Sequence, residues 1–125
     1  IMVENRHTGA LELIVGSSGG SRIITANILT TYAYLSHHGQ VSMDDVIARP
    51  RWHDQLLPPV TVFEYPGAQT PGFDNATVRA LTAKGHRAAY TAPGLSNAQA
   101  IQHTHAGSWH AASERRQYEA RGAAI

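Results

Sequence analysis

The stretch 11-LELIVGSSGGSRIITANIL-29 decides how this chain folds and where its chemistry would lie. An apolar, strand-like run at 11–15 is followed by small residues, and apolar residues at helical spacing begin at Ile23. Gly19 and Gly20 allow close approach of a ligand, because neither carries a Cβ and a positive φ costs glycine little. The following helix would direct its free N–H groups back at this loop. The stretch therefore predicts a strand–loop–helix pocket for an anionic substrate or for the oxyanion of an acyl-transfer intermediate.

The same letters spell Gly16-x-Ser18-x-Gly20, the pattern of a serine-hydrolase nucleophile elbow. Three interpretations of the loop are open. Ser18 attacks the substrate, or the loop supplies only backbone donors, or it is a glycine-rich connection without chemistry. Short Gly/Ser motifs recur by chance, so the motif alone does not choose between them.

Composition limits the class of protein. At 125 residues, with 42% hydrophobic and 15% charged residues, the sequence predicts one globular domain over 1–125. A formal charge of +1 gives no electrostatic basis for binding nucleic acid or an anionic membrane. The absence of cysteine excludes disulfides and thiolate metal sites. The triplet at 75–77 makes Asn75 a candidate for N-glycosylation in a loop-like setting.

Periodicity and turn residues predict an α+β fold in the order ββααβαβββ. Gly39 is expected to close the first helix as its C′ residue, and Ser42 and Asp74 to cap the next two. Residues 52–59 are expected to be irregular, because two prolines lie at 58–59. The predicted strands are 1–4, 10–15, 60–65, 87–91, 98–104 and 108–112; the helices are 21–38, 42–50 and 74–85, and 7–9 and 105–107 are turns.

Eight histidines raise the question of a metal site. His103 and His105 would share a strand face, while His37 and His38 fit a favourable interaction with a helix C-terminus. No set of His, Asp and Glu has the spacing of a zinc site, which needs three or four ligands. Neither a metal nor another cofactor is expected.

Two charged runs could be substrate clamps or structural junctions. In 49-RPRWHDQ-55 the junction is favoured, with Arg51 and Asp54 satisfying the backbone and each other. The run 113-SERR-116, which contains Arg116, allows the same two interpretations with the same preference.

Together these motifs resemble the gamma-glutamyltransferase (glutathione hydrolase) family, at the C-terminal part of its small subunit. The residues 15-VGSSGGSRIIT-25 resemble its glycine-pair loop and following helix, and 49-RPRWHDQLLP-58 resembles its Pro-Arg-x-His-x-Gln-x-x-Pro junction. The segments 81–86, 98–101 and 111–116 are similar to the parts that follow, so the resemblance covers nearly the whole chain.

The resemblance implies an N-terminal-nucleophile hydrolase, an αββα sandwich whose two subunits are cut from one precursor and whose missing segments complete this incomplete domain. A threonine freed by self-cleavage attacks the gamma-glutamyl amide, and the acyl-enzyme passes to water, an amino acid or a peptide. That threonine lies upstream of the residues present, as does a serine pair that binds the substrate carboxylate. The apolar, strand-like start at 1–3 likewise makes the sequence look like a piece of something longer.

The roles carried over from the family fall on a few residues. Gly19 and Gly20 would form the oxyanion loop and bind substrate together with Ser18, while Arg51, His53, Asp54 and Arg116 would be structural. The expected partners are the large subunit, the N-terminal part of the small subunit, glutathione or another gamma-glutamyl substrate, and an acceptor. The expected location is the secretory pathway, outside the cell or in a vacuole.

Two other functions remain as alternatives. One is a small serine esterase that uses Ser18 with an acid (Asp54 or Asp74) and a base (His86 or His103), an order that such enzymes allow. Two features disfavour the esterase: a predicted hairpin precedes the elbow, and 125 residues is short for that fold. The other is a non-catalytic binding or assembly module.

Overall fold

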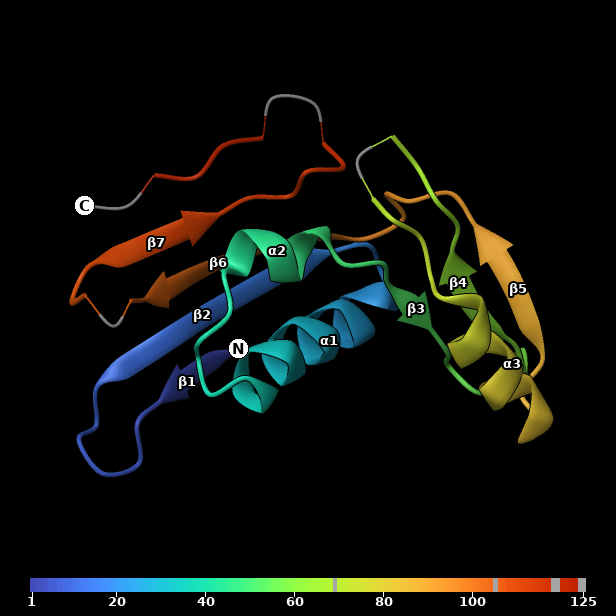
Figure 1. The fold of residues 1–125 in the computed structure, drawn as a ribbon, viewed down its shortest axis with the longest axis horizontal. Helices are drawn as coiled ribbons and strands as arrows, with labels where there is room; N and C mark the ends of the chain where they lie inside the picture. Colours follow the sequence, from blue (N-terminus) through green and yellow to red (C-terminus); the bar gives the residue numbers. More distant parts are fainter. Residues whose placement is uncertain (69, 105, 118–119, 124–125) are drawn as a thin grey trace.

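A computed structural model describes residues 1–68, 70–104, 106–117 and 120–123. It contains two sheets side by side, a four-stranded sheet ordered β1-β2-β6-β7 and a three-stranded sheet ordered β3-β4-β5 (Figure 1). The predicted α+β class is confirmed. The elements are β1 (Met2–Glu4), β2 (Leu11–Ser18), α1 (Arg22–Ser36), α2 (Met43–Ala48), β3 (Trp52–His53), β4 (Thr61–Glu64), α3 (Asn75–Ala83), β5 (Ala88–Thr91), β6 (Asn97–His103) and β7 (Trp109–Ala112).

The four-stranded sheet is antiparallel throughout, and α1 and α2 cover one of its faces (Figure 1). Alternation along β2 turns Leu13 and Val15 toward these helices, where both are buried. They pack in one core with apolar residues of both helices and of the neighbouring strands: Ala33, Tyr34, Met43, Val46, Ile47, Ala100 and Ala112. This core holds β2, and with it the start of the glycine loop.

The other face of this sheet carries an apolar row. Met2, Ile14, Ile101 and Ala111 are successive partners across the four strands, so their side chains share one face. Met2 and Ile101 are exposed, and Ile14 and Ala111 are half-buried. A contiguous apolar row left open to solvent is typical of a surface that another element covers.

Helix α1 forms where the sequence predicts it, but most of the apolar side chains that mark it face outward. Ala26, Thr30 and Ala33 are buried against the sheet, whereas Ile24 is 64% exposed and Ile28 is 55% exposed. Small side chains on the inner face let the helix lie close to β2. The periodicity of apolar residues predicts a helix with an apolar face, but it does not show what that face packs against.

The end of α1 differs by one residue from the prediction. His38 takes the first left-handed position, with φ 50°, and Gly39 follows with φ 71°. The Gly39 N–H donates to Tyr34 O at 3.0 Å and the His38 N–H to Leu35 O at 3.0 Å, which is the hydrogen-bond pattern of a Schellman motif. Gly39 is therefore the C″ residue, and His38 is the C′ residue.

The second sheet contains a strand that the sequence analysis missed. Trp52 and His53 form β3, which pairs with β4 through Phe63 and Val62, so the expectation of an irregular segment fails at its first two residues. Strand β4, helix α3 and strand β5 make a parallel βαβ unit.

The two predicted caps differ in outcome. Asp74 caps α3 as predicted and accepts from the N–H groups of Ala76 and Thr77, each at 3.0 Å. Ser42 occupies the N-cap position of α2 but makes no side-chain cap bond, contrary to expectation. In the part of the chain that the structure describes, no helix has the length and apolar character needed to cross a bilayer.

Candidate active-site loop

The glycine loop joins the end of β2 to the first turn of α1. Gly19 has φ 129° and Gly20 has φ 62°, so both use conformations that favour glycine, as predicted. The N–H groups of Arg22 and Ile23 bond back to Gly19 O at 3.2 Å and Gly20 O at 3.1 Å. Both glycines are exposed, and within the described ranges no backbone hydrogen bond uses their own N–H groups. The loop therefore presents free donors at the start of a 15-residue helix.

The two glycines are required for different reasons. A Cβ on Gly19 would lie 2.6 Å from Leu95 O and 2.9 Å from Ser96 Cα, which is closer than the backbone tolerates. A Cβ on Gly20 would meet nothing within 4 Å, so only its positive φ favours glycine there. The backbone of Leu95 and Ser96, before β6, is thus a wall behind Gly19: it packs against this glycine and leaves no room for a side chain.

Ser18 lacks the surroundings of a triad serine. Its hydroxyl accepts from Asn97 Nδ2 at 3.4 Å, and no histidine among the described residues hydrogen-bonds to it. Strand β2 is antiparallel to both neighbours, whereas an elbow serine follows a strand of a mostly parallel sheet.

The structure does not assemble the other residues of the esterase alternative around this serine. Asp74 caps α3, and the His103 ring lies edge-on to Trp109 with centroids 5.0 Å apart. Asp54 and His86 lie near each other, 3.8 Å apart, in a different part of the molecule.

The His53 side chain connects β3 to the first turn of α1, next to the glycine loop. Its Nδ1 lies 2.9 Å from Thr25 Oγ1, and its Nε2 lies 3.4 Å from Ser21 Oγ and 3.0 Å from Gln55 Oε1. Its side chain is buried. The sequence analysis placed His53 in a junction but missed Ser21 and Thr25, because no local signal links residues so far apart in the chain.

Arg51 pairs with Glu114, and the expected pair of Arg51 with Asp54 is wrong. Arg51 Nη2 lies 2.7 Å from Glu114 Oε2, and Arg116 bridges Glu114 at 2.8 Å and Glu64 at 2.7 Å. At most 7% of each of these four side chains is exposed. Two arginines and two glutamates therefore form a buried quartet that joins the loop before β3, strand β4 and the segment after β7.

The quartet is electrostatically compensated. Burial alone would raise the pKa of Glu114, but Arg51 and Arg116 beside it hold that pKa below its ordinary value. Glu114 Oε2 also accepts from the Ala98 N–H at 2.9 Å, so this oxygen is bound by both Ala98 and Arg51. A buried network of this kind, in which every charged side chain faces one of opposite charge, fixes the relative positions of the elements it joins.

Arg51 connects the quartet to the backbone that packs against the glycine loop. Arg51 Nη1 donates to Ser96 O at 2.7 Å, and the Cα of that serine is part of the wall behind Gly19. The contacts of Arg51 and Arg116 are those of a structural junction. Arg51 and Arg116 hold backbone that in turn limits where the glycine loop lies.

The remaining candidates lie apart from this loop. His37 Nδ1 lies 2.8 Å from Ala33 O at the end of α1, and Asn75 is exposed in the first turn of α3 and not in a loop. His105 lies outside the described residues. Among the described residues, no group of three His, Asp or Glu side chains could hold a metal ion.

Comparison with solved structures supports the fold. A Helicobacter pylori gamma-glutamyltranspeptidase mutant superposes with a TM-score of 0.74 at 24% identity, over 93% of this chain and 61% of that chain. A highly active mutant of the Pseudomonas nitroreducens enzyme gives 0.76 at 23% identity, over 100% of this chain and 60% of that chain. The chain thus shares the α+β fold of these gamma-glutamyltranspeptidases.

Sequence comparison identifies the family. A glutathione hydrolase from Aspergillus flavus is 31% identical over 94 residues, which are 75% of this chain but only 15% of that protein. The sequence model described as gamma-glutamyltranspeptidase matches residues 1–124. With the glycine-pair loop and the buried arginine junction in place, this chain belongs to the gamma-glutamyltranspeptidase family.

Proposed function

We propose that this chain is the part of a gamma-glutamyl hydrolase or transferase that supplies the oxyanion loop. The observation that carries the proposal is the pair of exposed N–H groups of Gly19 and Gly20 at the start of α1. The complete enzyme would cleave the gamma-glutamyl amide of glutathione and related compounds. The acyl-enzyme would form on an N-terminal threonine that is not among these residues.

The loop would act on charge that appears only during the reaction. When the threonine oxygen attacks the gamma-carbonyl carbon, the carbonyl π electrons move to its oxygen, and the threonine α-amine takes the hydroxyl proton. The Gly19 and Gly20 N–H groups would donate to that oxyanion. A fixed donor of this kind contributes about 10²- to 10³-fold to turnover, because it needs no reorganisation as the charge develops.

The exposed apolar surfaces support a role inside a larger assembly. Met2 and Ile101 of the row on the sheet, and Ile24 and Ile28 of the stripe on α1, are exposed in this chain. The chain spans 15% of the fungal relative's length. The large subunit and the N-terminal part of the small subunit would cover these surfaces. Glutathione or another gamma-glutamyl compound, with an acceptor amino acid, peptide or water, would be the substrates.

The proposed location is the secretory pathway, outside the cell or in a vacuole. Asn75 is exposed, as an N-glycosylation acceptor must be. Its position at the start of α3 leaves the side chain accessible beside the Asp74 cap.

The test compares this chain alone with the chain co-expressed with the preceding part of its precursor. We expect no release of the aniline from a gamma-glutamyl anilide by the chain alone, and poor solubility because its apolar faces are open. Activity should appear on co-expression, and disappear when the N-terminal threonine of the added segment is replaced by alanine. Activity of the isolated chain would refute the proposal. A soluble assembly that binds no gamma-glutamyl compound would instead favour a non-catalytic module.

A further inference from the structure

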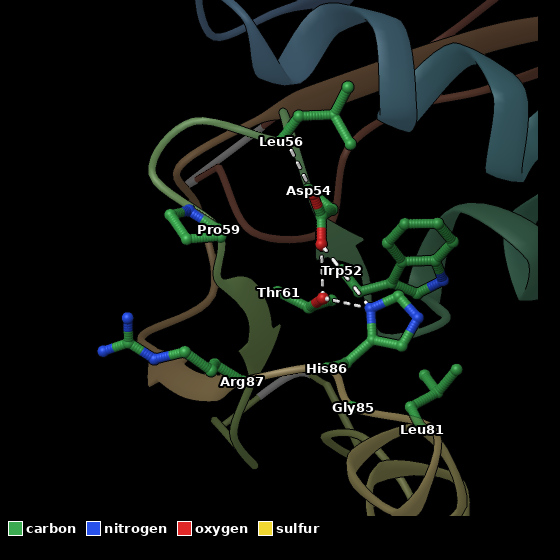
Figure 2. A pocket seen from close by; sticks show the side chains of 9 residues that line it. All are labelled: Trp52, Asp54, Leu56, Pro59, Thr61, Leu81, Gly85, His86 and Arg87. Atoms are coloured by element: carbon green, nitrogen blue, oxygen red, sulfur yellow. Dashed lines mark hydrogen bonds and ion pairs between the residues drawn. The ribbon is translucent and has the colours of Figure 1, made fainter.

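A separate cleft lies on the far side of β3 from the glycine loop. It has a volume of 480 Å³ and is open on one side, between β3, the 56–59 loop and the end of α3 (Figure 2). This volume is in the range of small-molecule sites. Trp52 and Asp54 line it, whereas His53 between them faces Ser21 and Thr25. Alternation along the strand thus separates the cleft from the loop.

The walls of the cleft are apolar. Trp52, Leu56, Pro59 and Leu81 surround the opening, and the carbon atoms of Gly85 complete the lining near the end of α3 (Figure 2). Leu56 is 81% exposed, so most of its side chain is accessible to a molecule in the cleft. These groups would favour a flat apolar or aromatic body.

Asp54 supplies a negative charge inside this apolar frame. One oxygen accepts from the Leu56 N–H at 2.9 Å, and the other accepts from the Thr61 hydroxyl. A carboxylate has about four lone-pair positions, so these two bonds fix Asp54 without saturating it. The same two bonds, with the His86 charge, hold the pKa of Asp54 below its ordinary value.

Two basic residues, His86 and Arg87, line the cleft near this charge. His86 Nδ1 lies 3.8 Å from Asp54 Oδ2 and 3.2 Å from Thr61 Oγ1, and its ring stands beside Leu81 at the cleft wall (Figure 2). The guanidinium of Arg87 points away from Asp54 (Figure 2). The cleft therefore combines the anchored carboxylate of Asp54 with the indole face of Trp52. The guanidinium of Arg87 lies at the rim and does not neutralise the carboxylate.

From this charge complementarity we propose that the cleft binds a small organic cation, an amidinium or ammonium carried on a flat apolar body. The cation would lie against the free lone pairs of Asp54, and its body would lie between Trp52 and Leu81. Burial of the body and attraction of the cation to the indole face add to the charge pair. This site is distinct from the glycine loop and does not depend on the proposed function.

The test uses three probes of the same shape and different charge: benzamidine, benzamide and benzoate. The complete protein is labelled with 5-fluorotryptophan, and its ¹⁹F spectrum is recorded during titration; the Trp52 resonance is assigned with Trp52→Phe. We expect benzamidine to shift the Trp52 resonance saturably, and at least 10-fold tighter than benzamide, because only the amidine gains a charge-assisted pair with the carboxylate. Benzoate should not bind.

Two variants and a control complete the experiment. Asp54→Asn should remove the preference for benzamidine over benzamide. Leu81→Ala should weaken all binding while keeping the carboxylate network, which guards against local disorder in the first variant. Asp44→Asn is the matched control, because Asp44 also pairs with a histidine, His110 at 2.8 Å, but lies outside the cleft. Equal binding of benzamide, preference for benzoate, or unchanged selectivity in Asp54→Asn would each overturn the proposal.

Discussion

Replacing Gly19 with alanine tests the glycine loop most directly. The new Cβ would lie 2.6 Å from Leu95 O and 2.9 Å from Ser96 Cα, and both are backbone atoms. Ser96 is itself held by Arg51 at 2.7 Å, so the wall cannot move away without breaking a buried bond. The loop must move instead, and a φ of 129° is in any case unfavourable for alanine.

The size of the effect follows from the donors that the loop carries. Losing one oxyanion donor costs about 10²- to 10³-fold in turnover, or about 2.7–4 kcal/mol. We therefore expect Gly19→Ala to lower kcat by at least about 10²-fold. Gly20→Ala is the matched control, because its Cβ meets nothing within 4 Å. A left-handed alanine costs about 1–2 kcal/mol, which is about tenfold if all of it is lost from the transition state.

The assay follows release of the aniline from a gamma-glutamyl anilide by the complete enzyme, with kcat and KM determined separately. The midpoint of thermal unfolding of each variant shows whether lost turnover reflects lost folding. A folded Gly19→Ala enzyme with nearly normal kcat would refute the assignment of the loop. If Gly20→Ala were the more damaging change, the steric argument that places the clash at Gly19 would be wrong.

Three further predictions concern the serine and the buried quartet. Ser18→Ala should keep most of the turnover, because among the described residues its hydroxyl hydrogen-bonds only to Asn97, at 3.4 Å; labelling of Ser18 by a fluorophosphonate with parallel loss of activity would contradict this. Arg51→Met should lower the free energy of unfolding by about 3–5 kcal/mol in denaturant titrations, since it leaves Glu114 buried without its partner, and Arg51→Met/Glu114→Leu should recover part of the loss. Because the pKa of Glu114 is lowered on folding, its contribution to stability is complete above the unfolded value near 4.5 and is lost as pH falls through the folded value. Glu114→Gln should flatten the acid limb of the stability curve; an unchanged slope would contradict the role of this carboxylate.

Local signals predicted the elements that position the site. The change from strand to helical spacing around Gly19 and Gly20 and the Asp74 cap depend on neighbours within a few residues, and the structure agrees with both. Strand β3 failed this kind of prediction, because Trp52 and His53 become a strand only through pairing with β4. The neighbouring prolines at 58–59 predicted irregular structure instead.

The missing parts of the site depend on contacts between distant segments. Arg51 was expected to pair with Asp54, three residues away, but its partner Glu114 comes from the segment after β7. The faces of α1 could not be assigned either, since the sequence shows an apolar stripe but not whether this chain or another covers it. Asp54 and His86 come together only because β4 and β5 are parallel and place the end of α3 beside β3.

The run around β3 contacts residues on both sides of the glycine loop. Arg51 reaches Ser96 behind Gly19, and His53 holds Ser21 and Thr25 just after Gly20. The two sides of the glycine loop are thus fixed from one short segment. Donors stabilise a transition state best when they are already in place before charge develops, so a loop held on both sides loses little free energy to reorganisation. Within the run 49-RPRWHDQ-55, Arg51 and His53 are therefore the residues that position this loop.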